Sequence, residues 1–385
     1  MRRVVFWMHL IAGVSAGVVV VVMAATGLVL TYERQLVAWS ERHYRTPAPA
    51  AGTRVPIDLL VGVAADRAAP AGATVTIARD EAAPVIVARG RTDMIFVGPY
   101  SGQIVGRGHT RWRAFFRTVT AWHRWLGGGP ERRAAGRAVT GASNLAFLFI
   151  VISGAWLWMP RHWSRQQLAQ VLWFRRGLSP KARDFNWHHV VGIWTLVPLA
   201  VVVASAVPLS YPWASDALYR LVGDTPPARR PRDARPASPP GREIVASTAA
   251  AAPRVALESL VTMAAQREPQ WRTMTIRLPD ATDRAVQVTV DGGNGGQPHL
   301  RSLLTFDAAS GTLLRREAFT DQGPGRRARA LLRFAHTGEV FGVVGQTVAG
   351  LVSLGSLVLV YTGVALSWRR WRRWRARAGE PRAAA

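Results

Sequence analysis

Four of the nine histidines in this sequence hold matching places in its two halves, and their imidazoles are the side chains best suited to chemistry. They are His9, His123, His188 and His336, and a glycine follows the first three after four residues, at Gly13, Gly127 and Gly192. Residues four apart share one face of a helix, so such a glycine leaves a hollow beside the imidazole. Neutral imidazole is the commonest metal ligand. The pattern predicts metal ligation with room for a bulky group next to the ring.

One of these positions has an alternative. His189 directly follows His188 and is the second candidate ligand, although only His188 has the glycine spacing. The remaining histidines lack a matching partner in the other half, and we expect them to be hydrogen-bonded groups near a membrane surface: His43, His109, His162 and His299.

The elements that must position the four histidines are membrane spans. Residues 185–215 contain no Asp, Glu, Lys or Arg, and at about 1.5 Å per residue such a run is long enough to cross a bilayer. Similar apolar runs occupy residues 4–32, 138–159 and 340–368. His9 and His188 open their spans, whereas His336 directly precedes its span. His123 lies on a separate helix, expected at roughly residues 111–126.

The charge distribution predicts the orientation of these spans. The chain has 49 basic and 23 acidic residues, and arginines collect at the N-terminus, in residues 160–184 and after residue 368. Basic segments flank spans on the cytoplasmic side, so both termini are expected in the cytoplasm and both long connections outside, in the periplasm of a bacterial inner-membrane protein. Because the arginines adjoin apolar runs, membrane lipid is the expected partner and nucleic acid is not.

The two outer connections resemble each other. In the first, a helical pattern at 57–67 precedes the strand-like segments TVTIAR, PVIVARG and DMIFVGPYSGQIVG. In the second, a helical pattern at 254–267 precedes WRTMTIRLP, AVQVTVDGG and LLTFDAASGTLLRRE. The last hairpin of each turns on Ser-Gly, where glycine supplies a positive φ. The sequence therefore predicts two parallel repeats, each with a small α+β module, related by an axis along the membrane normal.

This organisation gives an integral membrane α-helical fold with four transmembrane helices. The expected parts are helix 1 (1–33), outer module 1 (34–109), an interfacial helix with helix 2 (110–160), a cytoplasmic loop (161–184), helix 3 (185–215), outer module 2 (216–326) with a Pro/Arg-rich linker (225–253), helix 4 (327–370) and a basic cytoplasmic tail (371–385).

Two pairs of histidines at two membrane faces favour haem. An imidazole near hydrocarbon is costly and normally faces a partner or a cavity. An iron with two axial imidazoles from facing helices, its flat macrocycle lying over small residues, is a b-type site. The chain has no cysteine, which excludes disulfides, cysteine-ligated clusters, thiolate catalysis and c-type attachment. Two haem b groups stacked across the bilayer would conduct electrons.

Other chemistries fit the sequence less well. A zinc site needs three or four converging ligands, whereas these histidines pair at opposite ends. A proton path would use Asp or Glu inside the spans, which contain none. No phosphate-binding loop follows a strand, and no nucleophile motif stands at a strand-to-helix turn.

The order of motifs resembles the PepSY-associated transmembrane family of bacterial inner-membrane proteins, over roughly residues 3–370. The segments that carry the likeness are FWMHLIAGVSAGVVVVVMAATGLVLTYE, WHRWLGGG, WLWMP, NWHHVVGIW and HTGEVFGVVGQ, and VGPYSGQIVG and FDAASGTLLRRE resemble the ends of PepSY modules.

The resemblance implies a function. That family includes reductases of ferric siderophores with two haem b groups, and iron-regulated proteins of less certain activity. It implies haem ligation by the same four histidines and outward electron flow onto a periplasmic ferric siderophore. The chain shows no flavin or nicotinamide domain, so a cytoplasmic reductase or the quinone pool would donate the electrons. PepSY modules elsewhere act on peptidases, so the alternative is a haem-free protein that binds or regulates a periplasmic peptidase or other partner.

Overall fold

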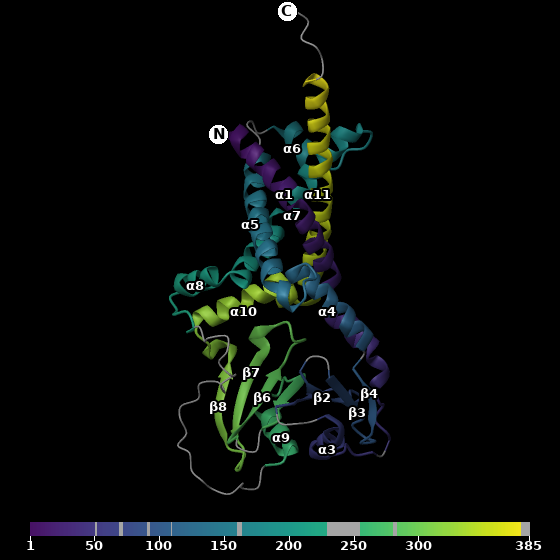
Figure 1. The fold of residues 1–385 in the computed structure, drawn as a ribbon. Helices are drawn as coiled ribbons and strands as arrows, with labels where there is room; N and C mark the ends of the chain where they lie inside the picture. Colours follow the sequence, from purple (N-terminus) through teal and green to yellow (C-terminus); the bar gives the residue numbers. More distant parts are fainter. Residues whose placement is uncertain are drawn as a thin grey trace, which may run out of the picture. The chain divides into compact units, whose positions relative to one another are not determined.

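The computed structural model describes residues 1–50, 52–68, 72–90, 93–108, 110–159, 164–228, 255–279 and 283–378. It divides into two compact parts (Figure 1). The helical unit comprises Met1–Gln35, Ala114–Ser215 and Arg329–Ala385. The sheet unit comprises Leu36–Arg113 and Asp216–Ala328.

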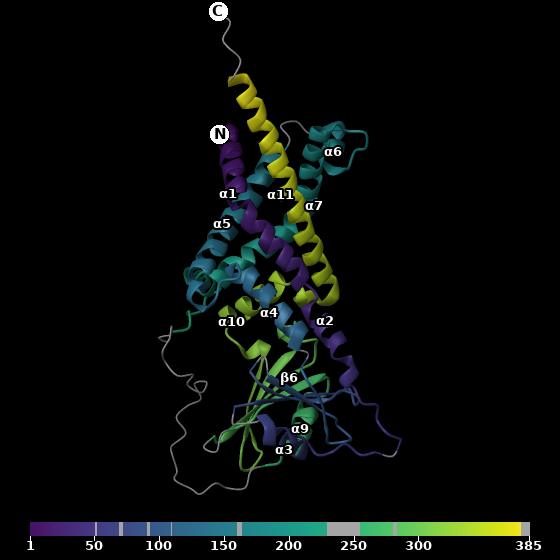
Figure 2. The same cartoon turned by 45° about the vertical axis from the view of Figure 1, so that its right-hand side comes forward.

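Four apolar helices form the helical unit, and each is long enough to cross a membrane. They are α1 (Arg2–Leu30), α5 (Arg133–Trp158), α7 (Pro180–Ser210) and α11 (Gly342–Ala378). Each contains most of one predicted span. Helix α1 packs against α5 and α11, and α7 packs against the same two; Figures 1 and 2 both show α1 beside α11. The helices therefore form a ring in which α1 and α7 lie diagonally opposite.

Shorter helices precede or connect these four. They are α2 (Glu33–Ser40), α4 (Thr110–Trp125), α6 (Arg165–Leu172), α8 (Pro212–Leu221) and α10 (Pro324–His336). Helix α4 corresponds to the separate helix expected to carry His123, and α10 ends at His336. Buried hydroxyls in the long helices bond to their own backbone carbonyls, as in Ser356 Oγ to Val352 O at 2.9 Å. Such bonds satisfy the hydroxyl groups inside the helices, where lipid hydrocarbon offers no hydrogen-bond partner.

The sheet unit contains one antiparallel sheet of eight strands in the order β4-β3-β2-β1-β5-β6-β7-β8. The strands are β1 (Thr74–Ala78), β2 (Val85–Arg89), β3 (Asp93–Val97), β4 (Ile104–Arg107), β5 (Thr273–Arg277), β6 (Ala285–Asp291), β7 (Arg301–Asp307) and β8 (Leu313–Ala318). Every segment that the sequence predicts to be a strand contains all or most of at least one of these strands. The glycines of both Ser-Gly turns, Gly102 and Gly311, have φ of +65° and +72°.

The strands of the two predicted modules belong to one sheet, because β1 pairs with β5 across the two halves. As edge strands of separate sheets, both would expose unpaired backbone N–H and C=O groups, and pairing removes two such edges. Thr76 lies opposite Thr275 at the centre of this register, with the hydroxyls 3.1 Å apart. The two halves are related by an approximate two-fold axis through this pair. Their likeness to PepSY modules stays a prediction.

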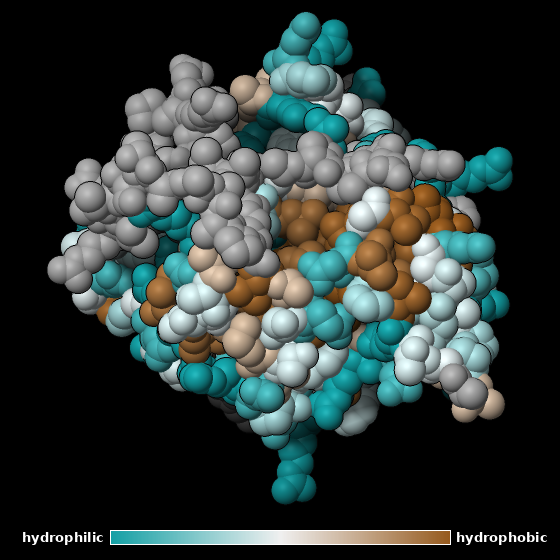
Figure 3. Space-filling model, turned by 90° about the horizontal axis from the view of Figure 1, so that it is seen from below, coloured by the Kyte–Doolittle hydropathy of each residue, from teal (hydrophilic) through white to brown (hydrophobic). Residues whose placement is uncertain are grey.

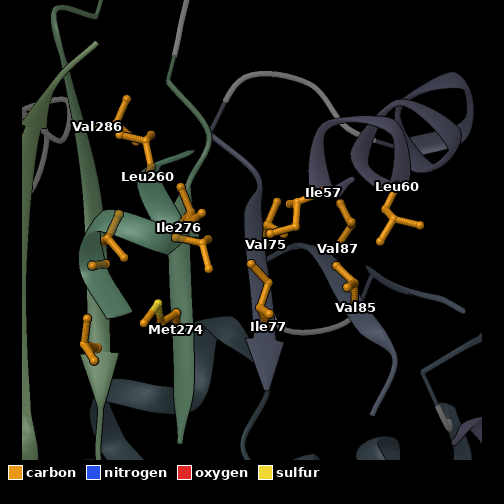
Figure 4. Close-up of a cluster of buried hydrophobic side chains, with 14 of the residues drawn as sticks. Ile57, Leu60, Val75, Ile77, Val85, Val87, Leu260, Met274, Ile276 and Val286 are labelled. Carbon is orange, nitrogen blue, oxygen red and sulfur yellow. The ribbon is translucent and has the colours of Figure 1, made fainter. Parts of the chain in front are cut away.

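The core of the sheet unit lies where α3 (Ile57–Ala68) and α9 (Leu257–Arg267) pack against the strands. Ile57 and Leu60 from α3 and Leu260 from α9 point toward strand residues such as Val75 and Ile276 (Figure 4). All five are buried. Buried and more exposed residues alternate along β1, β5 and β6, so one face of the sheet packs in this core.

Each of these helices supplies the N-terminal cap of the other. Asp58 accepts bonds from the backbone N–H groups of Leu257 (2.9 Å) and Glu258 (3.2 Å). Glu258 in turn accepts a bond from the N–H of Ile57 at 3.0 Å. Free N–H groups and the helix dipole both favour a carboxylate at this end. The acidic residue near the start of each helix is thus used across the two-fold axis.

Candidate functional site

His9 on α1 and His188 on α7 line the same cavity in the helical unit. Its volume is about 660 Å³, within the range of small-molecule and cofactor sites. The predicted glycines Gly13 and Gly192 also line it. An added Cβ at Gly13 would meet no atom within 4 Å. The structure therefore brings the first predicted pair to one cavity, with open space beside Gly13.

Both rings are held by a hydroxyl on a neighbouring helix. His9 Nδ1 lies 2.9 Å from Ser153 Oγ on α5, and His188 Nδ1 lies 2.9 Å from Thr362 Oγ1 on α11. In the described part of the chain, both rings make their hydrogen bonds through Nδ1. Nε2 is therefore left to bind another group. Metal-bound imidazoles have this arrangement, with the second ring nitrogen bonded to protein.

The second predicted pair also meets. The ring centres of His123 and His336 are 6.3 Å apart, with an interplanar angle of 56°. His123 Nδ1 lies 3.0 Å from Met23 O, and His336 Nδ1 lies 2.8 Å from Val202 O. These carbonyls belong to α1 and α7. As in the first pair, Nδ1 is bonded to protein and Nε2 remains.

The spacing of the second pair fits two axial ligands of one metal. Two metal–imidazole bonds of about 2.0–2.1 Å each, with roughly 1 Å between each nitrogen and its ring centre, put the ring centres about 6 Å apart. The observed separation is 6.3 Å. In the described residues, no three or more His, Cys, Asp or Glu side chains gather at one point. The donor set is a pair of imidazoles, which suits the two axial positions of haem iron.

The two adjacent histidines on α7 have different environments. His188 is held to α11, whereas His189 Nδ1 bonds to the carbonyl of Phe185 on its own helix at 2.9 Å, and its ring packs on that of Phe185. Both line the cavity. The bond between helices favours His188 as the ligand, because it fixes the ring relative to the bundle. Of the other histidines, His43 packs on Tyr44, and His109 and His162 lie outside the described residues.

The expected relation between His123 and Gly127 is wrong. Helix α4 ends at Trp125, and Leu126 and Gly127 have φ of +53° and +74°. The N–H of Gly127 bonds to Ala121 O at 3.2 Å, which closes the end of the helix. Gly127 therefore reverses the chain and does not lie one turn along the face of His123. The glycine beside that ring is Gly27 of α1, whose added Cβ would lie 3.3 Å from His123 Cε1.

The cavity of His9 and His188 is also lined by cationic side chains that sequence reasoning did not select. They are Lys181, Arg370 and Arg373. Trp158 lines the same cavity, and its buried Nε1 has no hydrogen-bond partner in the described structure. Apolar walls with several N–H donors suit an apolar molecule that carries carboxylates. The only sequence signal was the arginine-rich tail, which we assigned to lipid.

A buried carboxylate fixes α7 to α11 close to His188. Asp184 is fully buried one turn before His188. Its Oδ1 lies 3.0 Å from Arg183 Nη2, and its Oδ2 lies 2.7 Å from Arg369 Nη1 on α11. Removing one partner from a buried ion pair leaves an uncompensated charge. Asp184 therefore helps to hold the two helices that carry His188 and its hydroxyl partner, Thr362.

Comparisons with known proteins come from two sources. A family model described as the PepSY-associated TM region matches residues 6–370, which cover the sheet unit and most of the helical unit. A comparison with curated proteins found no match.

Proposed function

This chain belongs to the family of the PepSY-associated TM region, and on that premise we propose that it is a di-haem b electron-transfer protein of the bacterial inner membrane. It passes electrons across the membrane to a periplasmic ferric siderophore in iron uptake. The observation that carries the proposal is the pairing of His9 with His188 at one cavity and of His123 with His336 at 6.3 Å.

The residues fit two haem groups. His9 and His188 would hold one and His123 and His336 the other, each through Nε2, because Nδ1 is bonded to protein. Haem iron supplies reversible one-electron chemistry, whose potential the protein tunes by ligands, burial and hydrogen bonds. The cavity beside the first pair has mainly apolar walls. Lys181, Arg370 and Arg373 of that cavity would offset the charge of the haem carboxylates, because an unpaired charge is costly in an apolar surrounding.

The arginine distribution supports a direction for electron flow. His9 lies seven residues after Arg2, where α1 begins, and the hydroxyl partner of His188 lies seven residues before Arg369. Arginine-rich segments flank spans on the cytoplasmic side. Electrons would enter at His9 and His188 from a cytoplasmic reductase or the quinone pool. They would leave from His123 and His336 to the periplasmic acceptor, with both chain termini in the cytoplasm.

Spectroscopy of the purified protein tests the proposal. Protein from cells supplied with iron and haem precursor is expected to show a b-type α band in the reduced-minus-oxidised spectrum and two haems per chain in a pyridine haemochrome assay. His9→Ala and His123→Ala should each remove one haem, and His299→Ala, in the sheet unit, should remove none. A well-folded wild-type protein without haem would refute the proposal.

Acceptor reduction needs a second assay. In proteoliposomes with the holo-protein reduced from one side, ferric siderophore on the other side should be reduced, as followed by ferrous-iron capture. His123→Ala should abolish this reduction. Equal rates with and without His123 would exclude the transmembrane route.

A pocket in the sheet unit favours a second candidate function, that of a haem-free protein that regulates a periplasmic peptidase. The pocket has a volume of about 490 Å³ and lies between α3 and α9, with Arg54, Arg79 and Trp271 among its lining residues. Figure 3 shows apolar side chains among polar ones on the face seen from below. Under this function, Trp271→Ala would weaken peptidase binding and the histidine variants would change no spectrum.

A further inference from the structure

All four candidate ligands are held by one repeated structural element. Each ring nitrogen Nδ1 meets a Ser or Thr hydroxyl on another helix, and in His123 and His336 it also meets the backbone carbonyl three residues before that hydroxyl. For His123 these are Thr26 Oγ1 at 3.0 Å and Met23 O at 3.0 Å. For His336 they are Ser205 Oγ at 3.4 Å and Val202 O at 2.8 Å.

The first pair shares the contact with the hydroxyl. His9 Nδ1 meets Ser153 Oγ at 2.9 Å. His188 Nδ1 meets Thr362 Oγ1 at 2.9 Å.

We call the four partner sequences the receptor segments. They are MAATG (residues 23–27), IVISG (150–154), VVASA (202–206) and LVYTG (359–363). Each has an apolar residue, a hydroxyl residue three positions later and then a small residue, and each of the four long helices carries one of them.

The small residue that ends each segment makes room for the ring. An added Cβ on Gly154 would lie 3.3 Å from His9 Cε1, and one on Gly363 would lie 3.5 Å from His188 Cε1. Gly27 stands in the same relation to His123. The fourth segment has Ala206 at this place, and that residue is buried. Large side chains here would occupy the space of the imidazole.

The hydrogen bonds define the tautomer of each ring. A backbone carbonyl can only accept a hydrogen bond, so Nδ1 of His123 and His336 must carry the proton. In the other two segments the hydroxyl hydrogen is used within its own helix, from Ser153 Oγ to Phe149 O and from Thr362 Oγ1 to Val358 O, both at 2.7 Å. Those hydroxyl oxygens accept from Nδ1–H. In all four rings the lone pair is then on Nε2.

We propose that the receptor segments are positioning elements that hold each histidine as its Nδ1–H tautomer and present Nε2 for axial ligation. The ligation itself rests on the proposed function. A bond from Nδ1–H makes the imidazole a stronger donor, which stabilises the oxidised iron. The hydroxyls of Ser153 and Thr362 would therefore lower the potential of a haem held by His9 and His188, and those of Thr26 and Ser205 would act on a haem held by His123 and His336.

Potentiometric titration of the holo-protein tests this inference. Thr362→Val keeps the shape of the side chain and removes the acceptor oxygen, so it should raise one of the two midpoint potentials and shift the low-spin electron paramagnetic resonance signal of that haem. Ser153→Ala should affect the same haem. The matched control is Ser356→Ala, which removes a buried hydroxyl on α11 whose one bond among the described residues is to Val352 O of its own helix, and both potentials should stay unchanged. Two haems with wild-type potentials and signals in Thr362→Val and Ser153→Ala would overturn the inference and leave the proposed function standing.

A second measurement separates this inference from haem binding. Nitrogen-15 NMR of histidine-labelled protein without haem should show four Nδ1–H tautomers, assigned by single His→Gln variants, with His299 as the reference in the sheet unit. Nε2–H tautomers at the four sites would refute the receptor segments whether or not haem binds. If haem is absent from the protein but the four Nδ1–H tautomers are present, the proposed function fails and the structural role of the segments remains.

Discussion

If His9 and His188 hold a haem as proposed, replacing Gly154 with valine should remove that haem and leave the one at His123 and His336 in place. An added Cβ would lie 3.3 Å from His9 Cε1, closer than an ordinary contact between carbon atoms. Alanine therefore requires the ring to move by a few tenths of an ångström, whereas valine must also accommodate two further methyl groups beside it. Overpacking of this kind costs about 1–3 kcal/mol, which corresponds to a loss of haem affinity of roughly 5- to 150-fold.

The assay is haem content with the spectrum of each haem, compared among wild type, Gly154→Ala and Gly154→Val at limiting haem. We expect two haems for wild type, two for alanine with one shifted signal, and about one for valine. The haem at His123 and His336 serves as an internal control for folding. A valine variant with two haems and unchanged spectra would refute the packing of His9 against Gly154.

Three further changes test the supports of the site and the sheet unit. Asp58→Ala removes two capping bonds from α9 and should cost about 1–2 kcal/mol, seen as faster hydrogen exchange at the start of that helix; exchange equal to wild type would contradict the cross-capping. Asp184→Ala leaves Arg183 and Arg369 without their buried partner and should lower the unfolding free energy by about 3 kcal/mol in a detergent unfolding assay. Asp216→Ala, at a half-buried site, should cost less. Hydrogen bonds from the backbone and side chain of Ser310 lower the pKa of Asp307. Its ionised form therefore stabilises the β7–β8 turn above the unfolded pKa of about 4, and this stabilisation is lost as pH falls through the lower folded pKa. Asp307→Ala should reduce the hydrogen-exchange protection of that turn at pH values well above the unfolded pKa but not at pH values below the folded pKa. An equal loss of protection at high and low pH would contradict the role of the ionised carboxylate.

Much of the local structure could be predicted from the sequence. The four long helices follow from apolar runs that exceed a bilayer's thickness, since no other element satisfies the backbone there. The strands follow from alternation, as in β1 and β5, and the turns from glycines at positive φ such as Gly311. The four histidines were selected by matching positions in the two halves, and the structure brings them into pairs.

The receptor segments were missed, although a sequence signal for them exists. A hydroxyl residue followed by glycine or alanine occurs in each span, at residues 26–27, 153–154, 205–206 and 362–363. Such pairs are common where helices pack closely in lipid, so the pattern alone does not name a partner. The histidine partner becomes visible only when another helix delivers its ring to the segment.

What the sequence by itself determined is therefore the set of elements and the repeat, because these depend on residues close together along the chain. The tertiary structure decided the pairing of β1 with β5, the exchange of caps between Asp58 and Glu258, and the match of each histidine to its receptor segment. Those contacts join residues that are about 100 to 200 positions apart, such as His123 with Thr26 and Asp58 with Leu257. Gly127 forms a local turn, because α4 ends at Trp125 and the Gly127 N–H bonds back to Ala121 O. Long-range packing instead placed Gly27 of α1 beside the imidazole of His123.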